Sequence, residues 1–177
     1  MLIEMWSPAF KEKGEQRPPI RFKKGLNVVL GKEDGAMSIG KSSALLAIDF
    51  VFGGNTYIKS DGVSKEGHHI IYFAFEFDGD KKYFARNTGA ADTVQICDSN
   101  YELTGNSFSK SEFVEWLKVQ YKMDFTGISF RTALSSFFRV YGKKNTDELN
   151  PLQGVRGQNM EKSITTILTI FDVYKEI

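Results

Sequence analysis

The sequence predicts an α/β fold with α+β elements, in which a mixed sheet carries an antiparallel hairpin rich in aromatic residues. Three observations support this prediction. A short apolar run at 25–31 precedes a polar loop and an amphipathic helical pattern at 41–52, which is the order of strand, turn and helix. Two aromatic-rich runs then flank a glycine-containing turn within 70–87. A last helical stripe of apolar residues occupies 161–177.

Composition and charge limit the class of protein. The 177 residues suffice for one domain or slightly more, and 41% hydrophobic with 25% charged residues excludes wholesale disorder. A net charge of +1 gives no global attraction to nucleic acid, although a local basic face stays open. A single cysteine, Cys97, excludes a disulfide framework within the chain. Because there is no apolar run of about 18 residues and no secretory leader, we expect a cytoplasmic protein without membrane contact.

The N-terminal elements follow from their local patterns. Residues 1–6 alternate as a strand does, the polar and proline-containing residues 11–19 form a loop, and 20–22 returns beside the first strand. The run GLNVVLG at 25–31 is apolar without alternation, which is typical of a strand buried on both faces. Gly53 ends the helix that follows, because glycine tolerates the left-handed conformation after a helix.

The C-terminal elements are justified in the same way. Strands are expected at 70–78 and 82–87, on either side of the turn, and at 93–97. A capping-box pattern, serine followed three residues later by glutamate, opens a helix at Ser109. The apolar spacing within 130–141 favours another helix.

One segment carries the clearest chemical signal. Residues 35–42, GAMSIGKS, fit the phosphate-binding pattern GxxxxGK[ST] at every fixed position, between a predicted strand and a predicted helix. Glycines let backbone N–H groups wrap a phosphate, and the helix adds the positive end of its dipole. In this pattern Lys41 reaches the β- and γ-phosphates and the Ser42 hydroxyl binds Mg²⁺. The sequence therefore predicts ATP and Mg²⁺ as ligands.

The predicted contacts cover most of this segment. The residues expected to line the nucleotide are Gly35, Ser38, Ile39, Gly40, Lys41, Ser42 and Ser43. The predicted strand ends at Gly31, where the first motif glycine ordinarily stands, whereas Gly35 comes four residues later. Either Gly35 is the motif glycine after an insertion, or an enlarged phosphate loop spans 31–43.

A hydrolytic enzyme of this kind also needs an acidic residue at the end of a second apolar strand. Asp78 ends an apolar run, but the hairpin explains it better, and Asp172 follows a run with helical spacing. The chain therefore lacks complete hydrolytic machinery, and we expect it to be inactive alone. His68 and His69 have no partners at ligand spacing, which favours a structural or surface role.

Together these motifs resemble a known family. The order FxxGLNVVLG, IGKSSALLAIDFVFGG and a hairpin ending YFAR resembles the N-terminal half of an SMC/SbcC-like ABC ATPase head, a P-loop NTPase. Residues 39–54 and 130–142 are similar to the YydD-like bacterial proteins, whose C-terminal part is a domain of unknown function. The resemblance spans essentially the whole chain. It implies one lobe with a hairpin subdomain at 70–97, a helical part at 109–142, a Q-loop region at 150–158 and the start of a coiled-coil helix at 161–177.

The resemblance also implies a catalytic residue and partners. Gln153 matches the family's Q-loop glutamine, which binds Mg²⁺ and the attacking water, and Gln158 is the alternative. Arg86 matches a hairpin arginine, although a solvated surface arginine is the commoner case. A C-terminal lobe of the same ATPase and a second head complete the ATP sites in this family, so the expected assembly is a homodimer. The implied role is DNA repair or defence against foreign DNA, with DNA as a partner.

Two other functions stay open. The chain acts as a nucleotide-binding switch or scaffold without turnover of its own if no acidic residue completes the site. A small phosphate-loop kinase is the weaker alternative, because a long hairpin directly after the first helix departs from the alternation of strands and helices usual in such kinases.

Overall fold

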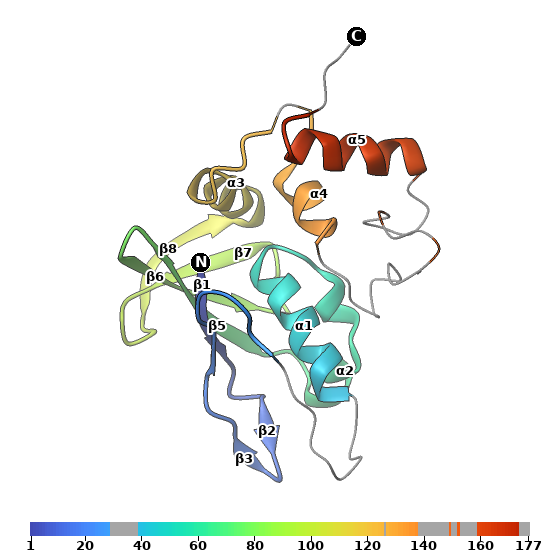
Figure 1. Cartoon of the computed structure of the whole chain (residues 1–177). Coiled ribbons are helices and arrows are strands. Elements are labelled where there is room, and N and C mark those ends of the chain that lie inside the picture. The colour runs from blue at the N-terminus through green and yellow to red at the C-terminus, as the bar shows by residue number, and fades with distance from the viewer. Residues whose placement is uncertain (29–38, 126, 138–148, 150–151, 153–158, 174–177) are drawn as a thin grey trace. The chain divides into compact units, whose positions relative to one another are not determined.

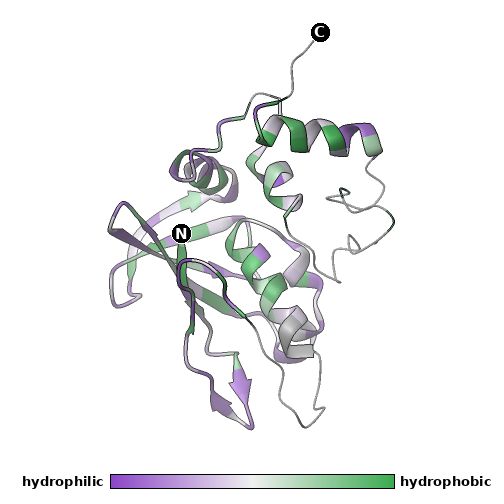
Figure 2. Cartoon of the chain, in the orientation of Figure 1, coloured by the Kyte–Doolittle hydropathy of each residue, from purple (hydrophilic) through white to green (hydrophobic). Residues whose placement is uncertain are grey.

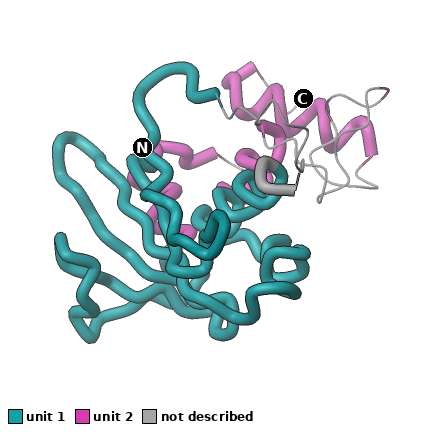
Figure 3. Tube along the Cα trace, turned by 90° about the horizontal axis from the view of Figure 1, so that it is seen from below, with its two compact units in different colours: residues 1–113 teal, residues 114–177 magenta. Residues whose placement is uncertain are grey.

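The computed structural model describes residues 1–28, 39–125, 127–137, 149, 152 and 159–173. The chain is an α+β protein that divides into two compact units, residues 1–113 and 114–177 (Figure 3). The first unit contains the sheet, and the second contains the C-terminal helices. Within the described ranges, no helix is long and apolar enough to cross a membrane.

A six-stranded sheet is the framework of the first unit (Figure 1). Its strands lie in the order β4-β1-β5-β6-β7-β8, and each neighbouring pair is antiparallel. The prediction of a mixed sheet is therefore wrong for the described residues, because the turns that join β5 to β8 are too short for the crossover of a parallel pair. The strands are β1 (Leu2–Trp6), β4 (Ile20–Arg21), β5 (Ile70–Phe77), β6 (Asp80–Asn87), β7 (Thr93–Cys97) and β8 (Leu103–Ser109).

The aromatic hairpin is confirmed. β5 and β6 pair without interruption from Ile70 opposite Asn87 to Phe77 opposite Asp80. The two residues between the strands, Asp78 and Gly79, have φ angles of 51° and 82°. A type I′ turn needs positive φ at both of its central residues. Asp78 therefore belongs to the hairpin, as predicted, but it lies in the turn and not in the predicted strand 70–78, and Asp80 already lies in β6.

One face of the sheet is packed with phenylalanine. Ile71, Phe73 and Phe75 alternate along β5 and are fully buried, as side chains on one face of a strand should be. Phe84 of β6 lies opposite Phe73, with ring centroids 5.6 Å apart. Phe113 reaches the same cluster, 5.2 Å from the Phe84 ring. Because burial of each ring contributes roughly 1.5–3 kcal/mol, this cluster stabilises the first unit.

The first unit also contains the long helix α1 (Ile39–Val51), which packs on the sheet. Its core-facing residues form one stripe, apolar in Figure 2: Leu46, Ala47, Phe50 and Val51. Gly53, with a φ of 87°, ends the helix as predicted. Phe52 then contacts the Phe75 ring edge to face, at 5.3 Å between centroids. The helix that carries the phosphate-binding motif is therefore anchored to the phenylalanine core.

Four short elements of the structure are not predicted by the sequence. Within the predicted loop 11–19, β2 (Lys11–Glu12) and β3 (Glu15–Gln16) form a small separate hairpin. The helical segments η1 (Thr56–Lys59) and α2 (Asp61–Glu66) follow α1. All four are too short to show a strand or helix period in the sequence.

The apolar run at 25–31 does not begin as a strand. Leu26 and Val28 are exposed over 82% and 65% of their surface. The Asn27 side chain accepts from the Lys23 N–H at 3.0 Å and donates to the Lys23 carbonyl at 2.8 Å, so the chain makes a local loop there. Residues 29–31 lie outside the described ranges. A strand that is apolar on both faces needs backbone neighbours and two covering layers, and the described residues give 25–28 neither.

The predicted helix near 109 is α3 (Lys110–Gln120), and its capping box is confirmed. The Ser109 N–H donates to Glu112 Oε2 at 2.8 Å, and the Glu112 N–H donates to Ser109 Oγ at 3.2 Å. The pattern at 130–141 forms α4 (Phe130–Ser135), and residues 138–141 lie outside the described ranges.

The last helix is shorter than predicted. The helix expected over 161–177 is α5 (Met160–Ile170). The Val173 N–H donates to the Leu168 carbonyl at 2.9 Å and the Asp172 N–H to the Thr169 carbonyl at 3.1 Å, while Asp172 has a φ of 54°. These two bonds form a Schellman motif, which ends a helix. Asp172 thus follows a helix, as its spacing predicted, and residues 174–177 lie outside the described ranges.

Candidate functional site

The described part of the phosphate-binding motif begins with α1. Outside the described residues are Gly31, Gly35 and Ser38. Inside α1 are Ile39, Gly40, Lys41, Ser42 and Ser43, of which the two serines are half-buried. A helix thus begins where the motif ends, as the pattern requires. The strand that the pattern requires before the motif is not formed over 25–28.

The start of α1 has the general chemistry of an anion site. The first N–H groups of a helix lack partners within it, and the helix dipole places partial positive charge there. α1 is 13 residues long, so its dipole is fully developed. The lysine and serine of the motif stand in its first turns, where a phosphate would meet both.

Arg86 holds the opposite end of α1 against the sheet. Its guanidinium donates to the carbonyls of Phe50 and Gly54, to Asn55 Oδ1 at 2.9 Å, and twice to the Ala91 carbonyl. The guanidinium carbon also lies 4.0 Å from the centre of the Phe50 ring. Arg86 is fully buried, so the expectation of a solvated surface arginine is wrong. Carbonyl groups at the end of α1 replace water around the charge.

A close approach makes glycine necessary at position 54. A Cβ atom there would lie 2.1 Å from Oδ2 of Asp49, a fully buried residue of α1. The Gly54 N–H donates to the Asp49 carbonyl at 2.8 Å. The chain therefore leaves α1 in direct contact with the last turn of the helix, which positions Gly54 for its bond to Arg86.

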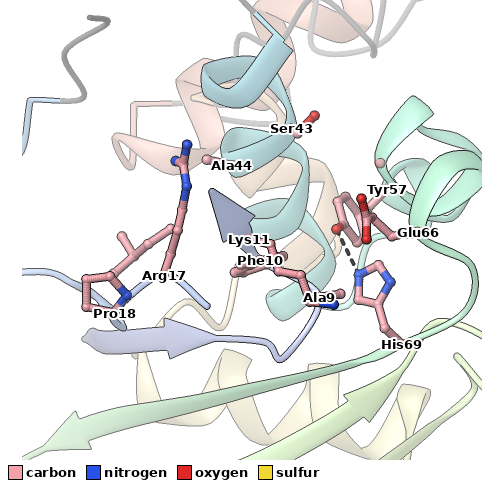
Figure 4. A pocket seen from close by; sticks show the side chains of 12 residues that line it. Ala9, Phe10, Lys11, Arg17, Pro18, Ser43, Ala44, Tyr57, Glu66 and His69 are labelled. Atoms are coloured by element: carbon pink, nitrogen blue, oxygen red, sulfur yellow. Dashed lines mark hydrogen bonds between the residues drawn. The ribbon is translucent and has the colours of Figure 1, made fainter. Parts of the chain in front are cut away.

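A cavity of about 240 Å³ opens beside α1, where Ser43 and Ala44 form part of its wall (Figure 4). Its walls come from α1, from the region around the β2–β3 hairpin, and from the segment between η1 and β5. The residues that matter chemically are Ser43, Phe10, Lys11, Arg17, Tyr57, Glu66 and His69. Pockets that enclose whole ligands typically measure roughly 300–1,000 Å³. The cavity therefore has room for one moiety of a nucleotide rather than for all of it.

His69 and Tyr57 form a fixed pair in the cavity wall. The Tyr57 hydroxyl lies 2.9 Å from Nε2 of His69, and Nδ1 of His69 lies 2.8 Å from the Gly67 carbonyl. Burial raises the pKa of Tyr57 to about 12, and the Glu66 carboxylate adds to this effect. His68 is exposed and meets Thr88 Oγ1 at 3.3 Å instead. The structural role expected for the two histidines holds for His68, whereas His69 also lines a cavity that sequence reasoning missed.

Charged groups occupy opposite sides of this cavity. Figure 4 shows Arg17 on the side of Ala44, with Tyr57, Glu66 and His69 together on the other side. Arg17 also forms an exposed ion pair with Glu12 at 3.6 Å. Separated positive and negative groups suit a ligand that carries hydrogen-bond acceptors at one end and donors at the other.

The other residues that the sequence offered for the site do not line this cavity in the described structure. Gln153 and the alternative Gln158 both lie outside the described residues. In the part of the chain that the structure describes, no group of three or more His, Cys, Asp or Glu side chains could hold a metal ion. Asp78 lies in the tight turn that joins β5 to β6, and Asp172 follows the end of α5.

No family model, curated protein or solved structure matches the chain.

Proposed function

We propose that the chain is the ATP-binding lobe of an SMC/SbcC-like ATPase, which engages a C-terminal lobe and a second head for ATP-dependent dimerisation and hydrolysis. The observation that carries this proposal is the complete GxxxxGK[ST] motif leading into the 13-residue helix α1. Arg86 binds carbonyl groups at the far end of helix α1, which fixes that end of the helix against the sheet. On the basis of the resemblance, we propose that the assembled protein acts in DNA repair or in defence against foreign DNA.

The residues of the motif suit a nucleotide bound with Mg²⁺. Lys41 supplies the positive charge for the β- and γ-phosphates. The Ser42 hydroxyl and the Gln153 side-chain oxygen are the hard oxygen ligands that Mg²⁺ prefers. An ion held there would neutralise charge on the phosphates. Ser43 follows Ser42 in the chain and lines the cavity, and we assign the cavity to the nucleoside end of the ligand.

The exposed residues Leu26 and Val28 also fit the proposal. An apolar run that leads into a phosphate loop is stable only between neighbouring strands. In the proposed assembly the C-terminal lobe supplies those neighbours and covers the run. The homodimer then forms when two heads enclose the nucleotides.

A nucleotide-dependent switch or scaffold without turnover is the second candidate. It is favoured by the positions of Asp78, which lies in the tight turn of the β5–β6 hairpin, and of Asp172, which follows the end of a helix. A site without an acidic residue holds a nucleotide but activates no water. The two candidates share the binding step and differ only in hydrolysis.

Binding is tested by titrating the chain with a fluorescent ATP analogue, with and without Mg²⁺. We expect a dissociation constant in the micromolar range, and we expect Lys41→Ala to abolish binding because it removes the phosphate-binding charge. Lys81→Ala is the matched control, since Lys81 is exposed on β6. Undiminished binding by Lys41→Ala would overturn the phosphate-loop assignment.

Hydrolysis separates the two candidates. The first predicts little turnover by the chain alone at low concentration, and turnover when a C-terminal lobe is added. The second predicts no turnover in either condition. Appreciable hydrolysis by this chain alone would contradict both.

A further inference from the structure

The pair Tyr57 and His69 has a defined direction of hydrogen bonding. A carbonyl oxygen only accepts, so the 2.8 Å contact between Nδ1 of His69 and the Gly67 carbonyl places a hydrogen on Nδ1. In the neutral ring Nε2 then carries a lone pair and accepts the hydroxyl hydrogen of Tyr57 at 2.9 Å. The Tyr57 oxygen is left with lone pairs and no free hydrogen.

This side of the cavity therefore presents acceptors. Tyr57 is buried and lines the cavity together with His69, to which its hydroxyl is bonded. Glu66, beside Tyr57 in Figure 4, adds a carboxylate that accepts hydrogen bonds. The donors Lys11 and Arg17 come from the region of the β2–β3 hairpin, and Arg17 lies on the opposite side. A ligand group that points toward Tyr57 must bring its own hydrogen atoms.

We propose that the Gly67–His69–Tyr57 relay makes this cavity selective for a 6-aminopurine, with the Tyr57 oxygen accepting from the 6-amino group. The inference rests on the proposed function, because the phosphates of the same nucleotide are assigned to the motif that leads into α1. A 6-keto purine places a lone pair against the Tyr57 oxygen, whose hydrogen already binds His69, so no hydrogen bond forms between the two oxygens. Phe10, whose ring lies edge-on to His69 with centroids 6.3 Å apart, supplies an aromatic wall for the base.

The test compares ATP with inosine triphosphate, which exchanges the 6-amino group for a 6-keto group and leaves the ribose and phosphates unchanged. Both nucleotides compete with a fluorescent ATP analogue for the full chain in Mg²⁺. We expect ATP to bind about tenfold more tightly, the difference that one unpaired buried polar group produces. Tyr57→Phe removes the acceptor and should bring the two affinities to within about threefold of each other.

Two further variants keep the result interpretable. Glu66→Gln changes an exposed residue, so folding is undisturbed, and its new amide donor should tighten binding of inosine triphosphate. Tyr72→Phe, on the sheet and outside the cavity, should leave the preference for ATP unchanged. Circular dichroism checks that each variant is folded.

The outcomes separate this inference from the proposed function. Equal binding of the two nucleotides by the wild type, with both lost in Lys41→Ala, would overturn the inference and leave the phosphate site standing. An unchanged preference for ATP in a folded Tyr57→Phe variant would also overturn it. No binding of either nucleotide by the wild type would overturn both.

Discussion

Arg86 offers the sharpest prediction about how the sheet holds α1. Arg86→Met keeps most of the buried apolar stem and removes every guanidinium hydrogen bond. The buried Gly54 carbonyl loses the donor at 2.9 Å, the Ala91 carbonyl loses two, and the contact 4.0 Å above the Phe50 ring is lost. An acceptor left unsatisfied in a protein interior costs roughly 1–3 kcal/mol, and a desolvated cation–π contact is worth about 2 kcal/mol. We expect the free energy of unfolding to fall by about 4 kcal/mol.

The assay is urea denaturation followed by tryptophan fluorescence. Trp6 of β1 stacks on Tyr72 with ring centroids 4.4 Å apart, so its emission reports on the sheet. Arg86→Lys keeps the charge but not the planar fork of donors, and it should lose about 2 kcal/mol. The control is Arg21→Met, whose side chain is 79% exposed and whose ion pair with Glu4 is 3.5 Å long. Its effect should stay within about 0.5 kcal/mol.

The reasoning fails if Arg86→Met and Arg21→Met destabilise the chain equally. It also fails if the midpoint of urea unfolding of Arg86→Met equals that of the wild type. Either result would mean that the carbonyls of Phe50, Gly54 and Ala91 find other partners when the guanidinium is gone.

The remaining predictions concern other parts of the chain. Gly54→Ala forces a Cβ to within 2.1 Å of Asp49 Oδ2 and should cost about 2 kcal/mol in urea denaturation; wild-type stability would refute the close approach. Ser109→Ala removes the cap of α3 and should cost about 1 kcal/mol, with Ser107→Ala as the control. Hydrogen bonds from Ser109 lower the pKa of Glu112, so its contribution is present at neutral pH and is lost as the pH falls through that lowered pKa. Glu112→Gln should therefore destabilise the chain at pH 7 and match the wild type in acid; a difference that persists in acid would contradict this. Burial raises the pKa of Cys97 to about 11, so alkylation by iodoacetamide at pH 8 should be slow until urea exposes the thiol, and rapid native labelling would refute it.

The sequence predicts best those elements whose signal is local. β1, the β5–β6 hairpin and β7 have aromatic or alternating runs bounded by turn residues. The start of α3 follows from two residues, because a capping box is made within one turn of helix. These patterns succeed because the residues that decide the structure are neighbours in the chain.

Elements whose conformation depends on residues distant in the chain are not predicted by local patterns. β8 is a polar strand at the edge of the sheet, with Gly105 at a φ of 84°, so its sequence shows neither alternation nor an apolar face. The run at 25–31 has the composition of a buried strand, yet Leu26 is exposed because the described residues supply no cover. Its conformation depends on what lies beside it rather than on its own pattern.

The candidate site also contains residues that a local pattern identifies and residues that only the fold brings together. Spacing alone identifies Lys41 and Ser42, since the motif is continuous. The cavity is assembled from Phe10, Tyr57 and His69, which stand in separate segments without a common pattern. The sequence alone suggests that Arg86 is a surface residue. The carbonyls that surround it come from the end of α1 and from Ala91, and no local pattern reveals them. Only the folded chain brings these groups together.

The most direct test of nucleotide binding is isothermal titration calorimetry of the chain with ATP and Mg²⁺. We expect one ATP to bind per chain in the wild type and in Lys81→Ala, and no measurable heat of binding for Lys41→Ala. An absence of binding by the wild type at millimolar ATP, or unchanged binding by a folded Lys41→Ala variant, would contradict it.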